Sequence, residues 1–214
     1  MRAGLLLAAA VLSACRAEPS RPFPVGLLRP VPPRVAAEAA RLGFDVAAAV
    51  PDGAVSAYAG APSHRVGTEV AADWTALRLL SARAVADGAR GFYFRLPPAP
   101  AGRDHLDYPE ELQAPARVLR ELQALRPVLE FGADASAPFA APPGVRARAW
   151  HFRGRGYLLL VNDSGDDAAF EGEVFEGLRA LFEARSDARR VLTTCGGRFC
   201  LPAGRALWLE GRLR

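Results

Sequence analysis

The chain has 214 residues and a mass of 22.8 kDa, which is enough for one ordinary domain or two small ones but not for a complete (β/α)8 barrel. Half of the residues are hydrophobic, 23% are charged, and Gly and Pro contribute 20 and 18 residues, a composition that excludes a disordered chain and a coiled coil. The formal net charge is +4, but the arginines are scattered among Asp and Glu without forming a basic stripe, so we expect no nucleic-acid partner.

Residues 1–15 have the pattern of a secretory signal. Met1 and Arg2 give a positive start, and residues 3–12 form an uninterrupted small and apolar run that is too short to remain as a membrane-spanning helix. The run ends in Leu-Ser-Ala-Cys, which resembles the bacterial lipobox. This resemblance implies that Cys15 is lipidated and becomes the first residue of the mature protein. An ordinary signal peptide with a chance cysteine at the cleavage point is the alternative.

Lipidation of Cys15 would determine where the protein resides. Two or three acyl chains, such as palmitate, would hold the mature protein on a membrane surface without spanning it. Arg16 stands where an aspartate is associated with retention on the inner membrane in some bacteria, so the resemblance favours the outer membrane. We therefore expect a protein of the bacterial cell envelope, with the membrane surface as a partner.

The mature chain begins with alternating helix and strand patterns. Residues 16–33 contain six prolines and are expected to form an extended tether that includes the first strand. Residues 34–134 then predict an α/β domain. The elements expected in chain order are a strand within 23–28, a helix over 34–42, strands over 44–50 and 55–59, a helix over 69–86, a strand over 91–96, and a helix from Pro109 that Pro115 would kink or restart.

The second half of the chain has strand patterns only. Residues 135–144 are rich in Ala and Pro and predict a linker. Beyond the linker, short apolar segments separated by turn residues predict a small antiparallel β-sandwich over 145–214. Its candidate strands are 145–152, 157–161, 168–175, 180–183, 189–194 and 206–209.

Several of these segments resemble one family. Phe23-Pro24-Val25-Gly26-Leu27, followed by residues 38–46 (EAARLGFDV), resembles the first β-α-β unit of glycoside-hydrolase-type TIM barrels. Residues 79–94 resemble their seventh helix and eighth strand, and residues 119–129 their last helix. Residues 145–163 resemble the opening hairpin of the β-sandwich that often follows such barrels. The resemblance implies a partial (β/α) barrel-like domain followed by a β-sandwich.

The departure from that family bears on function. Roughly two dozen residues separate Asp52 from Leu77, where a full barrel would place about 150 more. The fourth strand, which precedes the acid/base carboxylate in retaining glycosidases of this kind, has no counterpart. Glycoside hydrolysis needs two facing carboxyl groups. We therefore expect a non-catalytic binding or structural role, towards carbohydrate or an envelope protein. A small glycoside hydrolase acting on cell-surface or extracellular polysaccharide is the alternative.

Four or five parallel strands cannot close into a barrel, so the sheet must have two edges. We expect the C-terminal domain, or a second copy of the chain, to pack on this open side.

One polar cluster lies where the loop after the seventh barrel strand would be. Glu69 is the best position there for a surviving carboxylate, and His64 and Arg65 are candidate contacts to a sugar or an anion. Glu69 would also be favoured in the first turn of a helix without any catalytic role.

A second polar cluster follows the last predicted strand of the α/β domain. Asp104 and Asp107 are candidate partners for Glu69 in catalysis, and His105 and Tyr108 are candidate ligand contacts. A solvated loop that caps the next helix needs the same residues. Two Asp and one His leave no fourth metal ligand, and the chain has no P-loop or H-E-x-x-H motif, so we expect no metal and no cofactor.

Cys195 and Cys200 are placed for a disulfide. If residues 197–198 form a two-residue hairpin turn, the two cysteines lie directly opposite each other, about 4.5 Å apart at Cα, which a disulfide accepts. Exported proteins favour such bridges, and a free or redox-active pair is the alternative.

Overall fold

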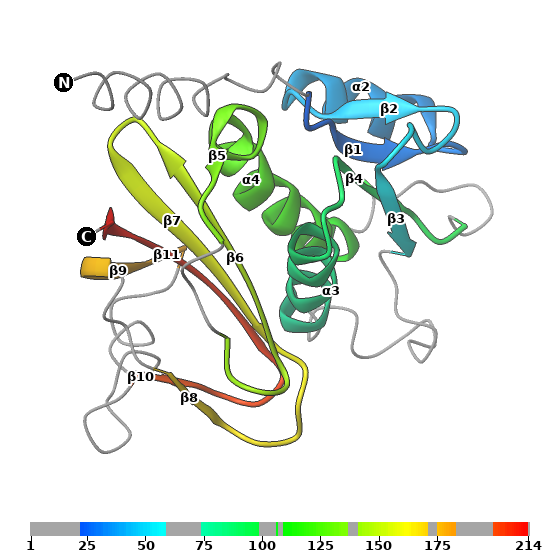
Figure 1. The fold of residues 1–214 in the computed structure, drawn as a ribbon. Coiled ribbons are helices and arrows are strands. Elements are labelled where there is room, and N and C mark those ends of the chain that lie inside the picture. The colour runs from blue at the N-terminus through cyan, green and yellow to red at the C-terminus, as the bar shows by residue number, and fades with distance from the viewer. Residues whose placement is uncertain are drawn as a thin grey trace, which may run out of the picture.

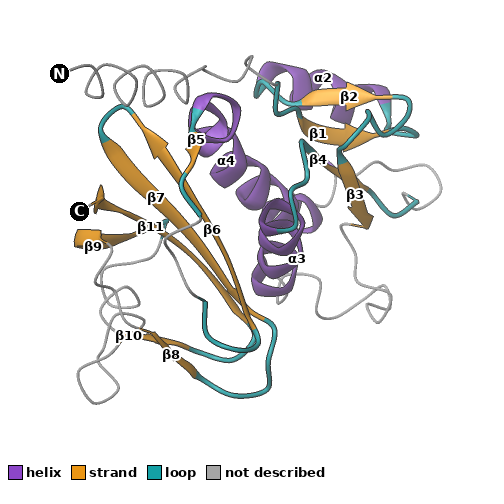
Figure 2. Ribbon diagram, in the orientation of Figure 1, coloured by secondary structure: helices purple, strands orange, loops and turns teal. Residues whose placement is uncertain are grey.

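A computed structural model describes residues 22–58, 74–98, 106, 109–136, 141–170, 175–182 and 199–213. Over these ranges a parallel sheet and an antiparallel sheet lie on either side of two helices, α3 (Trp74–Ala86) and α4 (Pro109–Phe131) (Figures 1 and 2). One continuous cluster of buried side chains runs from the parallel sheet through these helices to the antiparallel sheet. No described helix is long and apolar enough to cross a membrane.

The parallel sheet has four strands in the order β2-β1-β4-β3. Its strands are β1 (Val25–Leu28), β2 (Asp45–Ala47), β3 (Val55–Tyr58) and β4 (Phe92–Arg95). In a closed eight-stranded barrel the first strand pairs with the second and the eighth, and the eighth also pairs with the seventh. The observed order agrees with that arrangement. The described strands nevertheless form an open sheet, so a closed barrel is not present in this part of the chain.

Two helices begin at prolines, whose fixed φ suits the first helical turn. Helix α2 (Pro33–Arg41) has Pro33 at its start, and Gly43 follows its end with a φ of 79°. Helix α4 begins at Pro109 as predicted, but Pro115 does not restart it, since the helix continues through Pro115 and Pro127. A proline inside a helix costs about 3 kcal/mol. The deep burial of one stripe offsets this cost, and that stripe consists of Val118, Leu119, Leu122, Leu125 and Val128.

The described part of the C-terminal region has antiparallel strands, as predicted, in a five-stranded and a two-stranded sheet. The larger sheet has the order β5-β6-β7-β11-β9, with β5 (Ala133–Asp134), β6 (Val145–Phe152), β7 (Arg155–Asn162), β11 (Arg205–Leu213) and β9 (Phe175–Leu181). The smaller sheet pairs β8 (Ala168–Phe170) with β10 (Phe199–Leu201).

Side chains alternate between two cores across the five-stranded sheet. In β7, Leu159 and Val161 join the helices in the main core, whereas Leu158 and Leu160 belong to a second core that includes Leu201 of β10. Both faces of the sheet are therefore buried, which explains why β7 is a nearly continuous apolar run.

Two expectations about the domains need correction. The boundary was expected after residue 134, but Ala133 and Asp134 pair with His151 and Trp150 and so belong to the C-terminal sheet. Among the described residues this sheet also packs on the helices and not on the open side of the parallel sheet, and packing of a second copy of the chain there stays a prediction. Its strands β6, β7 and β11 pack against α3, and β6 packs against α4. Packing on the helices buries their apolar faces, whereas sheet edges expose backbone polar groups that gain less from burial. The predicted strand over 189–194 lies outside the described residues.

Candidate functional site

The sequence-predicted catalytic positions follow the carboxyl ends of two neighbouring strands. Tyr58 ends β3, Arg95 ends β4, and the two residues are direct partners in the sheet register. The two segments that carry the candidate residues therefore leave the sheet from adjacent points. The candidates themselves lie outside the described residues; they are His64, Arg65, Glu69, Asp104, His105, Asp107 and Tyr108. Their assigned roles stay predictions.

Two of the three cysteines, Cys15 and Cys195, also lie outside the described residues. Cys200 is buried in β10, where it is in register with Ala169 of β8. The environment of Cys200 is that of a structural position, and its predicted link to Cys195 stays a prediction.

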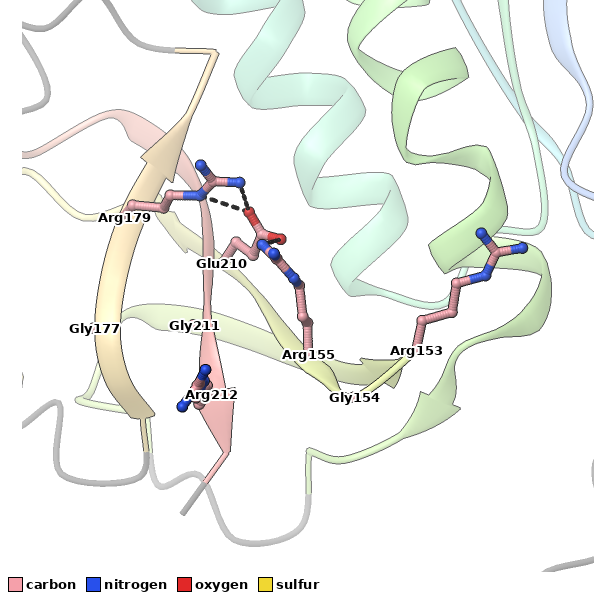
Figure 3. A pocket seen from close by; sticks show the side chains of 8 residues that line it. All are labelled: Arg153, Gly154, Arg155, Gly177, Arg179, Glu210, Gly211 and Arg212. Atoms are coloured by element: carbon pink, nitrogen blue, oxygen red, sulfur yellow. Dashed lines mark hydrogen bonds and ion pairs between the residues drawn. The ribbon is translucent and has the colours of Figure 1, made fainter.

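The described residues form a pocket of about 560 Å³ on the five-stranded sheet (Figure 3). Three segments supply its walls: the β6–β7 hairpin, β9, and the end of β11. The lining residues are Arg153, Gly154, Arg155, Gly177, Arg179, Glu210, Gly211 and Arg212. The charged groups of the pocket are thus four arginines and one glutamate, so positive charge is in excess.

Local backbone conformation brings these side chains together. Arg153 and Gly154 both have positive φ, 50° and 75°, which is the conformation of a two-residue hairpin turn. The turn places Arg155 at the start of β7. Glu210 is in β11, which lies between β7 and β9 in the sheet. Its register partners are Tyr157 of β7 and Arg179 of β9. The register of β11 with β9 then shifts between Glu210 and Arg212, an irregularity that re-aims side chains at the end of the strand.

Glu210 is the centre of the pocket. Its residue exposure is only 5%. Arg155 donates from Nη1 to Oε1 at 2.6 Å, and Arg179 donates from Nε to Oε2 at 2.6 Å and from Nη2 to the same oxygen. The Tyr157 hydroxyl donates to Oε1 at 3.3 Å. Every carboxylate oxygen therefore has a charged donor (Figure 3).

The hydrogen bonds determine the charge of Glu210. Burial alone would raise the pKa of its carboxyl, but hydrogen bonds from Arg179 and Arg155 outweigh burial and hold the pKa below the usual 4.5. Burial, together with the negative charge of Glu210, raises the pKa of the Tyr157 hydroxyl. Glu210 is accordingly ionised at neutral pH, and it has no proton to give to a leaving group.

Among the described residues, no second carboxylate lines the pocket. Glu121, the other buried carboxylate among the described residues, pairs with Arg78 between α3 and α4, at 2.9 Å from Nε to Oε2. Asp163, which follows β7, pairs with Arg83 of α3 and Arg146 of β6, so it holds the sheet to a helix. In the part of the chain that the structure describes, no group of three or more His, Cys, Asp or Glu could hold a metal ion.

A second hollow, of about 450 Å³, lies between α2 and α4. Its walls are mostly apolar, with Leu27, Val35 and Leu119 among them, and Glu38, Arg117 and Arg120 add the charged groups. Glu38 is paired with Arg41 of its own helix at 2.6 Å. This hollow therefore offers an apolar surface and no convergent catalytic groups.

Sequence reasoning did not find the Glu210 pocket. The sequence holds one local signal. Arg155 and Tyr157 alternate along β7, and they lie on the same face of the sheet as the core residues further along that strand. Glu210 has the corresponding position in β11. Arg179 joins them only because β9 is the next neighbour of β11, which no local pattern shows.

Comparisons with known proteins give glycoside hydrolases as structural neighbours at low similarity. No family model and no curated protein sequence matches the chain. A GH30 endoxylanase from Clostridium papyrosolvens C71 superposes with a TM-score of 0.40 and 13% identity, over 64% of this chain and 38% of that chain. An α-amylase from Anoxybacillus gives 0.40 and 15%, over 65% and 33%. The GH30 subfamily 8 xylanase Xyn30A from Clostridium acetobutylicum gives 0.39 and 10%, over 89% and 48%.

The chain spans less than half of the length of each of these enzymes. TM-scores below 0.5 do not transfer an activity, so the function has to be argued from the site.

Proposed function

We propose that the protein is a lipid-anchored protein of the bacterial cell envelope that binds a ligand, in a carbohydrate-related role, and does not hydrolyse it. One observation carries the proposal: the carboxylate of the described pocket, Glu210, is held ionised by two arginines. Glycoside hydrolysis needs two carboxyl groups about 5 to 10 Å apart, one of them with a raised pKa. The described residues supply the pocket with one carboxyl group, and its pKa is lowered.

The lipid anchor supports the envelope location. The apolar run before Cys15 and the Leu-Ser-Ala-Cys sequence are the features that a lipoprotein signal needs. Wild-type protein expressed in bacteria fed labelled palmitate should carry the label and sediment with membranes. Cys15→Ser should lose both properties. Wild-type protein without label, together with Cys15→Ser that still sediments with membranes, would contradict the anchor.

The predicted Cys195–Cys200 disulfide belongs to the same proposal, since export brings the chain into an oxidising compartment. Mass spectrometry of non-reduced protein isolated from the envelope should find the two residues linked. Two alkylatable thiols in that material would contradict the bridge.

A small glycoside hydrolase is the competing function. It would use Glu69 with Asp104 or Asp107, and the register partnership of Tyr58 with Arg95 favours it, because the segments that carry these carboxylates start from adjacent strand ends.

Chromogenic glycosides separate the two functions. The purified full-length protein should release no chromophore beyond the level of Glu69→Gln. Glu38→Gln, which alters an exposed carboxylate of α2, is the matched control. Turnover that disappears in Glu69→Gln and persists in Glu38→Gln would establish the hydrolase and reject the binding role.

A further inference from the structure

We infer that the Glu210 pocket is an oxyanion site that takes a phosphate or sulfate group carried on a larger molecule. The inference names the ligand class for the binding role proposed above and rests on that proposal. It stands on three features of the pocket: its charge balance, the orientation of its donors, and the space between them.

The charge balance leaves positive charge without a counterpart. Arg155 and Arg179 together neutralise Glu210 and exceed its charge. Arg153 and Arg212 line the same pocket, and no carboxylate among the described residues forms an ion pair with either. Arg155 and Arg179 converge on Glu210, whereas the Arg153 side chain extends away from it and lies over the Phe152 ring (Figure 3). The two converging guanidinium groups carry one positive charge more than the carboxylate, and a bound anion would compensate it.

Glu210 orients the donors. A guanidinium has five N–H donors in a rigid plane. Arg179 uses Nε and Nη2 on Glu210, which leaves Nη1, and Arg155 uses Nη1, which leaves Nε and Nη2. These two arginine side chains are 65% and 58% exposed, whereas the Glu210 side chain is 7% exposed. The buried carboxylate thus fixes two arginines from beneath, and their remaining donors are available to a ligand.

Glycines leave room for the ligand. Gly154, Gly177 and Gly211 line the pocket between the arginines. A Cβ added at Gly154 or Gly177 would meet no atom within 4 Å, so open space adjoins the backbone there. A pocket of about 560 Å³ exceeds what one phosphate or sulfate group fills, and it can accept part of the molecule that carries the group.

The chemistry of the pocket selects an oxyanion over a neutral sugar. Arginine forks match the oxygen spacing of phosphate and sulfate through paired, charge-assisted hydrogen bonds. The net positive charge of the pocket also favours an anionic group over a neutral one. A phosphorylated or sulfated saccharide and a phospholipid headgroup both present this chemistry.

Calorimetric titration of the purified full-length protein, in neutral detergent, tests the inference. Inorganic phosphate and sulfate should each bind saturably at one site, and glucose should not compete with either. Arg212→Ala should weaken phosphate binding about tenfold or more. Arg205→Ala is the matched control because Arg205 is an exposed arginine in the same strand, β11, outside the pocket, and it should leave the affinity unchanged.

Two further ligands distinguish the source of the group. Binding of glucose 6-phosphate that depends on Arg212 would support a saccharide ligand, and binding to phosphatidylglycerol vesicles over phosphatidylcholine vesicles that depends on Arg212 would support a headgroup. Either result supports the oxyanion site. No phosphate or sulfate binding, or binding that falls equally in Arg212→Ala and Arg205→Ala, would overturn it.

Failure of the oxyanion site can be told apart from failure of the proposed binding function. Neutral oligosaccharide binding without phosphate binding would reject the oxyanion and keep the proposed function. Glycoside turnover that depends on Glu69 would reject the proposed function, whatever the pocket binds.

Discussion

Nε of Arg78 lies 2.9 Å from Oε2 of Glu121, and this ion pair joins α3 to α4 inside the layer between the two sheets. Both side chains are more than nine-tenths buried. A buried charge without its partner is costly, so the pair favours the one arrangement of the helices in which the two charges meet.

Removing one charge of this pair should therefore destabilise the protein strongly. Glu121→Gln should lower the free energy of unfolding by about 3 kcal/mol, because it removes the carboxylate that faces the buried Arg78 guanidinium. Replacing both residues by Leu should cost less than the sum of the two single Leu substitutions. Urea denaturation of the four proteins in this cycle measures the coupling, and additive effects would show that the pair has no energetic role.

Gly26 should tolerate no side chain. A Cβ at this position would lie 1.9 Å from the backbone oxygen of Asp45, so β1 and β2 could not keep their pairing. Gly26→Ala should reduce stability by about 3 kcal/mol or prevent folding. Gly165→Ala is the control, since an added Cβ there meets no atom within 4 Å, and it should change stability by less than about 0.5 kcal/mol. Equal melting temperatures for the two variants would contradict the close approach of the strands.

The α/β part should not be stable alone. Trp150 and Trp208 stack at 5.6 Å between ring centroids and belong to the same buried cluster as α3 and α4. A fragment of residues 16–134 lacks both tryptophans and the sheet that covers the helices, and should aggregate or self-associate. Gel filtration and thermal melting check this. A monomeric fragment with a cooperative transition would show that the sheet is dispensable.

Glu210 should make the free energy of unfolding depend on pH in the acid range. Its folded pKa is lowered, so its contribution is fully present above the usual pKa of 4.5 and is lost as the pH falls through the lower folded value. At pH 7, Glu210→Gln should cost about 1 to 2 kcal/mol, a modest figure because both arginine partners are largely exposed.

Urea denaturation of wild type and Glu210→Gln from pH 7 to pH 3 checks this prediction. The difference between the two proteins should shrink below pH 4.5. A difference that stays constant over this range would show that the ion pairs do not set the charge of Glu210.

The order of elements was largely predictable, because it depends on periodicities that lie within each segment. The alternation in β6, the apolar run in β7 and the proline at the start of α4 identify these elements directly. Ala133 and Asp134 were missed as a strand, since two residues are too few to show a period and their pairing with β6 is the only feature that defines them.

The described site was not predictable, because Arg155, Arg179 and Glu210 come from three strands whose adjacency depends on the order β7-β11-β9. The strands are not consecutive in the chain, so the convergence of their side chains is a property of the assembled sheet. The candidates proposed from the sequence, Glu69 and Asp104 among them, lie outside the described residues and stay predictions.

The ionisation of Glu210 tests the account most directly, because a carboxylate that is already ionised at neutral pH suits a binding site and not an acid catalyst. The side-chain carboxyl carbon of Glu210 can be followed by NMR during an acid titration of the full-length protein, and assigned by its absence in Glu210→Gln. The account predicts a pKa below the ordinary 4.5. A pKa above that value would contradict it, since a carboxyl that holds its proton could act as a general acid.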